Sequence, residues 1–152
     1  MSSTTDRIEK QIHLRAPQAR VWRALTSSSE FGTWFGVRIA GEFAVGSHLK
    51  GQITIPGYEQ CLFEVVVDRM EPEHSFDYRW HPYAVDPKLD YSKEPMTLVE
   101  FRLESKDAGT QLTVVESGFD KLPAARRAEA FRMNSGGWEG QLRNIERHVT
   151  AR

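Results

Sequence analysis

The sequence lacks a second cysteine: Cys61 is alone among 152 residues, which excludes an internal disulfide framework and a zinc site built from several cysteines. A chain of this kind does not depend on an oxidising compartment. It also lacks long hydrophobic runs, because no apolar stretch approaches the roughly 18 residues of a membrane-spanning helix. We therefore expect a cytoplasmic protein with no membrane partner.

Neither charge is in surplus, since 20 lysines and arginines stand against 21 aspartates and glutamates. The formal net charge of −1 gives no overall field that would attract nucleic acid. The five histidines show no metal-ligand spacing, and the glycines do not form a phosphate-binding loop. These absences favour a protein without a metal or other cofactor and without a nucleic-acid partner.

The residues that are present suit an ordinary globular domain, with 39% hydrophobic and 27% charged residues. A chain of this length can bury a sizeable core within one domain. Its polar first residues lack the basic-then-apolar order of a signal peptide. We expect a disordered segment at 1–6, followed by a single domain at 7–152.

Apolar spacing and turn residues predict a strand, two helices, six more strands and a long helix. The first strand covers 7–15, a helix opens at Ala16-Pro17, where proline fits the first helical turn, and a short helix covers 30–35. Short β-rich runs separated by glycine and proline then predict an antiparallel meander. Its strands are expected near 37–43, 46–55, 58–70, 74–81, 96–106 and 109–117.

The C-terminal part carries one apolar stripe with spacings of three and four residues, which is typical of a helix of about 26 residues. The stripe consists of Ala124, Ala128, Phe131, Ser135, Trp138, Leu142, Ile145 and Val149. Such a stripe could pack on a partner helix or on the predicted sheet, and we favour the sheet because its apolar face needs a cover. Ser135-Gly136-Gly137 predicts either a close approach to the helix backbone or a break between two helices.

Together these elements predict an α+β fold in which a curved, seven-stranded antiparallel sheet grips a long C-terminal helix. Two short helices follow the first strand. A strongly curved sheet cannot contact a straight helix along its whole length. We therefore expect a cavity between the sheet and the helix.

This order of elements, with five local motifs, resembles the START-like (SRPBCC, helix-grip) superfamily. The motifs are Ala16-Pro17 with Val21-Trp22-Arg23-Ala24-Leu25-Thr26, Trp34-Phe35, Thr97-Leu98-Val99-Glu100-Phe101, Leu112-Thr113-Val114 with Glu116-Ser117-Gly118-Phe119, and Asn134 with Gly137-Trp138. Within that superfamily the chain resembles the bacterial family named after the C-terminal domain of the heat-shock chaperone ATPase activator. The resemblance spans about residues 7–150. It implies the helix-grip fold and a central cavity for apolar small molecules, and it implies no catalytic residue.

In a fold of this kind, five aromatic side chains would line the cavity: Trp34, Phe35, Tyr78, Trp80 and Trp138. Aromatic rings provide flat apolar walls, and the polar atoms of tryptophan and tyrosine can orient a ligand.

Glu116 shares the strand parity of Leu112 and Val114, so it should point toward the covered side of the sheet. A carboxylate there must be paired or hydrogen-bonded, and desolvation would raise its pKa. It could then anchor a ligand or act as a general acid or base. The alternative is a carboxylate at the cavity rim that forms an ion pair with an arginine.

We predict a protein that holds a hydrophobic or aromatic small molecule between the sheet and the C-terminal helix. One alternative is a polyketide cyclase- or hydratase-like enzyme that uses Glu116 as general acid or base. A second alternative, suggested by the family name alone, is a stress-related co-chaperone, with a chaperone as the less favoured partner. A homodimer through an exposed strand or the 82–95 loop is a further expectation, because long ordered loops often serve as lids or subunit contacts.

Overall fold

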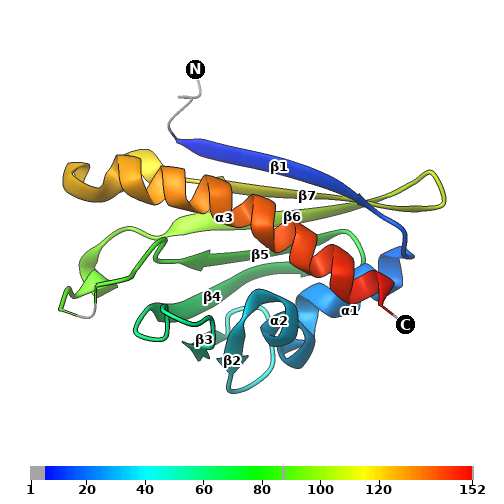
Figure 1. Ribbon diagram of the computed structural model, residues 1–152, viewed down its shortest axis with the longest axis horizontal. Coiled ribbons are helices and arrows are strands. Elements are labelled where there is room, and N and C mark those ends of the chain that lie inside the picture. Colours follow the sequence, from blue (N-terminus) through cyan, green and yellow to red (C-terminus); the bar gives the residue numbers. More distant parts are fainter. Residues whose placement is uncertain (1–5, 87, 152) are drawn as a thin grey trace.

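The computed structural model describes residues 6–86 and 88–151 (Figure 1). The segment predicted to be disordered, 1–6, lies outside this range except for Asp6. The backbone oxygen of Asp6 accepts a hydrogen bond from the amide of Gly118 at 3.1 Å. Among the described residues, no helix combines the length and the apolar character needed to cross a membrane.

One layer of the fold is a seven-stranded antiparallel sheet in the order β1-β7-β6-β5-β4-β3-β2. Its strands are β1 (Arg7–Leu14), β2 (Val37–Ile39), β3 (His48–Ile53), β4 (Leu62–Glu71), β5 (Ser75–Trp80), β6 (Thr97–Lys106) and β7 (Gly109–Ser117). Strands β2 to β7 follow one another as a meander, and β1 joins the open edge of β7. The predicted α+β architecture is confirmed.

Several strands are shorter than the sequence predicts, and turn residues explain two of these differences. The strand expected at 37–43 ends at Ile39, because Gly41 adopts a φ of 100°. The strand expected at 58–70 begins only at Leu62, because the preceding residues form turns that are closed by backbone hydrogen bonds from Tyr58 to Ile55 and from Cys61 to Tyr58.

Two short helices, α1 (Gln18–Thr26) and α2 (Ser28–Phe35), follow β1 and close one end of the sheet (Figure 1). Pro17 is the N-cap of α1. Helix α2 begins two residues earlier than predicted, because the Ser27 hydroxyl accepts a hydrogen bond from the backbone amide of Glu30 and caps it. Gly32 brings α2 very close to β2, since a Cβ built on it would lie 2.2 Å from the carbonyl oxygen of Val37.

The long helix α3 (Ala124–Thr150) runs across one face of the sheet without interruption (Figure 1). The preference for packing on the sheet is therefore confirmed, and a break at Ser135-Gly136-Gly137 is excluded. The predicted stripe is correct from Trp138 onward, where Trp138, Leu142, Ile145 and Val149 are buried. It is wrong at Ala124 and Ala128, which are exposed.

The first turns of α3 differ from the prediction because they pack on a short 3-10 helix, η2 (Phe119–Lys121), as well as on the sheet. Phe131 meets Phe119 edge-on, with ring centroids 5.3 Å apart. Ala130 is the buried alanine of this region. A second 3-10 helix, η1 (Tyr91–Lys93), lies in the segment between β5 and β6.

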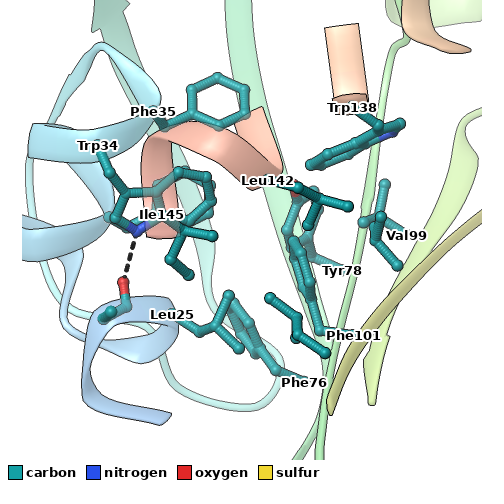
Figure 2. Packing of buried hydrophobic residues seen from close by; sticks show 14 of the residues in the cluster. Leu25, Trp34, Phe35, Phe76, Tyr78, Val99, Phe101, Trp138, Leu142 and Ile145 are labelled. Atoms are coloured by element: carbon teal, nitrogen blue, oxygen red, sulfur yellow. Dashed lines mark hydrogen bonds between the residues drawn. The ribbon is translucent and has the colours of Figure 1, made fainter. Parts of the chain in front are cut away.

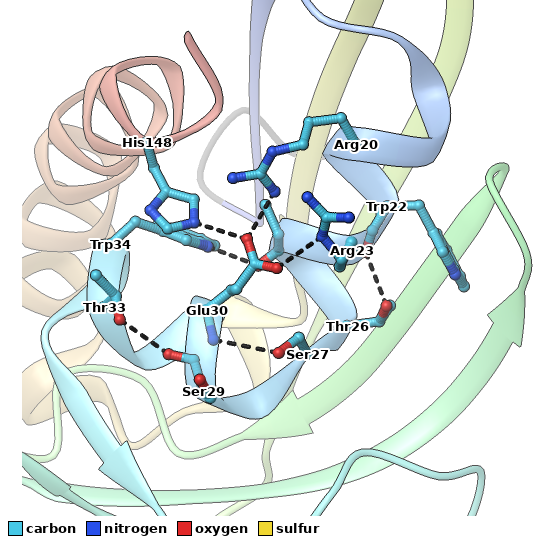
Figure 3. Close-up of polar contacts among 11 residues, drawn as sticks. Arg20, Trp22, Arg23, Thr26, Ser27, Ser29, Glu30, Thr33, Trp34 and His148 are labelled. Carbon is cyan, nitrogen blue, oxygen red and sulfur yellow. Dashed lines mark hydrogen bonds and ion pairs between the residues drawn. The ribbon is translucent and has the colours of Figure 1, made fainter. Parts of the chain in front are cut away.

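A group of charged side chains joins the three α-helices near the end of α3 (Figure 3). One oxygen of Glu30 in α2 accepts hydrogen bonds from Arg20 at 2.6 Å and from His148 at 2.8 Å. Its other oxygen accepts from Arg23 at 2.9 Å. Burial acts to raise the pKa of this carboxyl, but the bonds from His148, Arg20 and Arg23 outweigh it, so the pKa is lowered.

We expect Glu30→Gln to lower the free energy of unfolding by about 1–2 kcal/mol at about pH 7, because it removes charge-assisted hydrogen bonds that are partly exposed to water. A lowered folded-state pKa makes this contribution present above the ordinary value of 4.5 and lost as the pH falls through the folded-state pKa. The two proteins should therefore converge in stability once the pH has fallen below the folded-state pKa. Urea unfolding at several pH values checks this, and a difference independent of pH would contradict it.

Candidate ligand-binding cleft

A cleft of about 260 Å³ opens at one end of the interface between α3 and the sheet. Its walls come from the end of α2, the β3–β4 connection, the segment after β5 and the middle of α3. Apolar side chains dominate the lining, among them Phe35, Ile53, Ile55, Phe63, Trp80 and Met133. Of the described residues that line the cleft, none is a lysine, arginine, aspartate or glutamate.

A smaller hollow of about 100 Å³ shares part of its walls with the cleft and is also lined by Trp138. The two share Phe35, Trp80, Asn134 and Gln141 in their walls. At the outer side, Tyr58 is 44% exposed and Leu62 is 39% exposed. The cleft therefore has an apolar mouth, apolar walls and an aromatic inner end.

The structure brings three of the predicted aromatic residues to this cleft. Phe35 and Trp80 line the main cleft, and Trp138 lines the inner hollow. The ring centroids of Phe35 and Trp80 lie 5.9 Å apart in an edge-to-face arrangement, and those of Trp80 and Trp138 lie 5.8 Å apart with the two rings stacked. Figure 2 shows Phe35 and Trp138 on the same side of the packed core.

The other two predicted aromatic residues lie in the core and outside the lining of the cleft. The indole of Trp34 donates to the carbonyl oxygen of Ala24 at 2.8 Å, which fixes it between α1 and α2 (Figure 2). Tyr78 is completely buried, and its ring meets those of Phe31, Phe76 and Phe101. Burial raises the pKa of Tyr78 well above its ordinary value, and the nearby charge of Glu116 adds to this effect.

Glu116 is fully buried on β7 and forms the centre of a hydrogen-bonded cluster. One carboxylate oxygen accepts from the Trp138 indole at 2.8 Å and from the Asn134 amide at 3.0 Å. The other accepts from the Trp80 indole at 2.8 Å and from the Thr97 hydroxyl at 2.5 Å. We call these five residues the Glu116 cluster.

The alternative prediction, an ion pair between Glu116 and an arginine, is wrong. All hydrogen bonds that Glu116 accepts from described residues come from neutral side chains. Burial raises the pKa of Glu116, and the donors Thr97, Trp80, Trp138 and Asn134 partly oppose that rise. Two members of the cluster, Trp80 and Asn134, also line the cleft. Glu116 therefore holds Trp80 and Asn134 in place in the cleft wall, from the side that faces away from the cleft.

His81 supplies the most deeply buried polar side chain of the lining. It is 7% exposed, and its Nδ1 has no hydrogen-bond partner among the described residues. Desolvation is the main cause that lowers its pKa, which favours the neutral imidazole. The neighbouring Tyr83, also in the lining, has a φ of 50°, a left-handed conformation that is uncommon for a bulky residue.

The segment between β5 and β6, expected to act as a lid or a subunit contact, is fastened to α3 by Arg126. The guanidinium pairs with Glu94 at 2.7 Å, donates to the carbonyl oxygen of Pro82 at 2.8 Å and lies 4.8 Å from the ring centroid of Tyr91. This fastening holds His81 and Tyr83 against the cleft. No group of three or more histidine, cysteine or acidic side chains in the described parts of the chain is arranged to hold a metal ion.

Sequence reasoning did not identify several residues of the site. The amide of Asn134 reaches Glu116 on β7, a contact that the sequence does not indicate. Thr97 and Gln141 were not assigned to the site from the sequence, because their contacts depend on how β6 and α3 are placed in the fold. The pattern that could have placed Thr97 is strand parity, because it shares a face of β6 with Val99 and Phe101.

Comparison with known proteins places this geometry in a family. The model of the family described as "Activator of Hsp90 ATPase homolog 1-like protein" matches residues 15–150. Protein MLL2253 from Mesorhizobium loti is similar in structure, with 21% identity, a TM-score of 0.74 and coverage of 94% of this chain and 96% of that chain. The curated proteins contain no match.

Two other solved structures are similar. The Aha1 dimer from Colwellia psychrerythraea shares 17% identity with a TM-score of 0.72, over 95% of this chain and 96% of that chain. DynU16, a protein in the dynemicin biosynthetic locus, shares 21% identity with a TM-score of 0.73, over 96% of this chain. The match covers 48% of DynU16, so this chain spans about half of its length. At these identities the likeness shows the fold, and the resemblance to the helix-grip superfamily is confirmed.

Proposed function

The chain belongs to the Activator of Hsp90 ATPase homolog 1-like protein family, and on that premise we propose that it binds a hydrophobic or aromatic small molecule in the cleft between α3 and the sheet. The observation that carries the proposal is the apolar, uncharged lining of a hollow within an otherwise closely packed interface. Ligand sites are typically concave, mostly apolar and furnished with a few polar groups. His81 and Asn134 supply such groups here.

The alternative role for Glu116 as a proton-transferring residue has less support from the geometry. Its carboxylate is fully buried and accepts five hydrogen bonds from the side chains around it. A general acid or base must come within hydrogen-bond reach of the reacting atom. In this arrangement Trp80 and Asn134 stand between Glu116 and the cleft, so the carboxylate supports the wall.

The glycines of α3 give the proposal a matched test. Gly136 and Gly137 both lie within the helix, where each costs about 1 kcal/mol relative to alanine. A Cβ added at either position would meet nothing within 4 Å. Only Gly137 is among the residues that line the cleft. A side chain at 137 therefore narrows the cleft, whereas one at 136 does not.

We expect Gly137→Leu to weaken binding of the neutral dye N-phenyl-1-naphthylamine by about tenfold or more, because the added side chain occupies part of the cleft. Gly136→Leu is the matched control and should change binding less than about twofold. Both variants should be at least as stable as the unchanged protein, since leucine is the better helix former. Dye fluorescence against protein concentration measures the affinity. Equal effects of the two substitutions, or no dye binding by the unchanged protein, would overturn the proposal.

A further inference from the structure

We propose that the ligand of this cleft is an organic cation, with an apolar or aromatic body and an ammonium group that carries N–H donors. This inference rests on the proposed function, because it names the ligand class of the same site. Three features of the lining carry it: the sign of the nearby charge, the kind of polar atoms left free, and the aromatic rings.

Two carboxylates accept hydrogen bonds from side chains of the lining. Glu116 accepts hydrogen bonds from Trp80 and Asn134, and the exposed Glu129 accepts one from the Tyr83 hydroxyl at 3.3 Å. Every hydrogen bond to Glu116 from described residues comes from a neutral side chain, and each of these can donate, as an ionised carboxylate requires. A buried anion without a cationic partner attracts positive charge strongly, because the low-polarity surroundings screen it little.

Two guanidiniums act on residues of the lining, that of Arg126 on His81 and that of Arg132 on Tyr83, and neither arginine lines the cleft. Arg126 pairs with Glu94 and donates to the carbonyl oxygens of Pro82 and Tyr83. A carboxylate ligand would therefore meet no lysine or arginine side chain among the described residues of the lining, and it would be repelled by Glu116.

The N–H donors of the inner wall are also engaged within the protein. The indoles of Trp80 and Trp138 and the amide of Asn134 all donate to Glu116. The Gln141 amide donates to the carbonyl oxygen of Phe35 at 2.9 Å. What Asn134 can offer a ligand is consequently its carbonyl oxygen, an acceptor.

His81 provides an independent sign of a missing polar partner. Its ring is 93% buried, it lines the cleft, and its Nδ1 lacks a partner among the residues described. A buried polar atom without a partner is costly. With the ring proton on Nε2, Nδ1 is an acceptor that a ligand N–H could satisfy.

The aromatic rings complete the site. Phe35, Trp80 and Trp138 lie with their centroids 5.8–6.4 Å apart and bound the inner end of the cleft. Cations bind favourably over the faces of such rings, most strongly over tryptophan. Because both indoles donate their N–H to a carboxylate, their ring faces are richer in electrons than those of a free indole.

The test compares three probes that share one ring system and differ in charge: 2-(1-naphthyl)ethylammonium, 2-(1-naphthyl)ethanol and 1-naphthylacetate. Isothermal titration calorimetry of the unchanged protein should give about tenfold tighter binding for the ammonium than for the alcohol, with the carboxylate weakest. The preference should persist at high salt, because the interacting charges are shielded from solvent. Alcohol binding equal to ammonium binding, or tighter carboxylate binding, would overturn the inference and leave the proposed function standing.

Failure of all three probes and of the neutral dye would instead overturn the proposed function, and the inference with it. Glu116→Gln provides a second measurement, since it removes the charge and keeps the side-chain length. The ammonium preference over the alcohol should fall to about twofold or less in this variant, while Glu139→Gln, the control at an exposed carboxylate of α3 that pairs with Lys10, should retain it. An unchanged preference in a folded Glu116→Gln protein would also overturn the inference.

Discussion

Replacing Glu116 with alanine is expected to lower the free energy of unfolding by about 3–5 kcal/mol. The loss arises because the carboxylate is the common acceptor for four buried or half-buried side chains from β5, β6 and α3. Without it, the indoles of Trp80 and Trp138 lose their partner in a place that water does not readily reach. Equilibrium unfolding in urea gives the measurement.

Two variants separate the causes of that loss. Glu116→Met fills the volume and still leaves the donors without an acceptor, so it should retain most of the destabilisation. Thr97→Val removes a single donor and should cost about 1 kcal/mol. A Glu116→Met protein as stable as the unchanged one would show that the donors find other partners and that the Glu116 cluster does not hold the fold together.

The pH dependence of this effect has the opposite sign to that of Glu30. The folded-state pKa of Glu116 is raised above its ordinary value of 4.5, chiefly by burial. The folded protein therefore binds this proton more tightly than the unfolded chain, so the contribution of Glu116 to stability is fully present below 4.5 and declines as the pH rises through the folded-state pKa. The difference between the unchanged protein and Glu116→Met should consequently be larger at about pH 4 than at about pH 7.

Gly32→Ala should lower the free energy of unfolding by about 3 kcal/mol, although alanine is the better helix former. The added Cβ would lie 2.2 Å from the carbonyl oxygen of Val37; the backbone of α2 fixes the Cβ and the oxygen is itself a backbone atom, so α2 and β2 must move apart. The same substitution at Gly136, where a Cβ meets nothing within 4 Å, should stabilise the protein by about 0.5–1 kcal/mol.

The two alanine variants therefore differ in the sign of their effect, and thermal unfolding of both measures it. Because α2 ends at Phe35, a residue of the cleft wall, Gly32→Ala should also weaken binding of the neutral dye. Equal stabilities for Gly32→Ala and the unchanged protein would mean that α2 lies farther from β2 than the structure has it.

The element order and the inward side of Glu116 could be predicted because both depend on local periodicity. Alternation along β7 places Glu116 on the same face as Leu112 and Val114, and this holds whatever lies opposite. Its partners could not be predicted, because Thr97 and Asn134 reach it only through the register of β6 with β7 and the position of α3.

Which aromatic residues lie in the core and which line the cleft also could not be predicted from the sequence. Tyr78 and Trp80 are neighbours on the same face of β5, yet the first is enclosed by other rings and the second borders the cleft. The different surroundings of these two side chains depend on where α3 moves away from the sheet. The wrong prediction for the exposed Ala124 and Ala128 has a similar cause, because the helical period alone does not tell which turns of the helix pack on another element.

The pairing of β1 with β7 has a consequence for biosynthesis. Every residue of β1 pairs with a residue between Thr110 and Ser117, about a hundred positions later in the chain. At typical elongation rates of about 5–20 residues per second, the first strand waits some 5–20 seconds for its partner to leave the ribosome. During that interval Ile8 and Leu14, both buried in the finished protein, are available to other nascent chains. The yield of folded protein at high expression levels should therefore depend on how well β1 is kept from other nascent chains before β7 emerges from the ribosome.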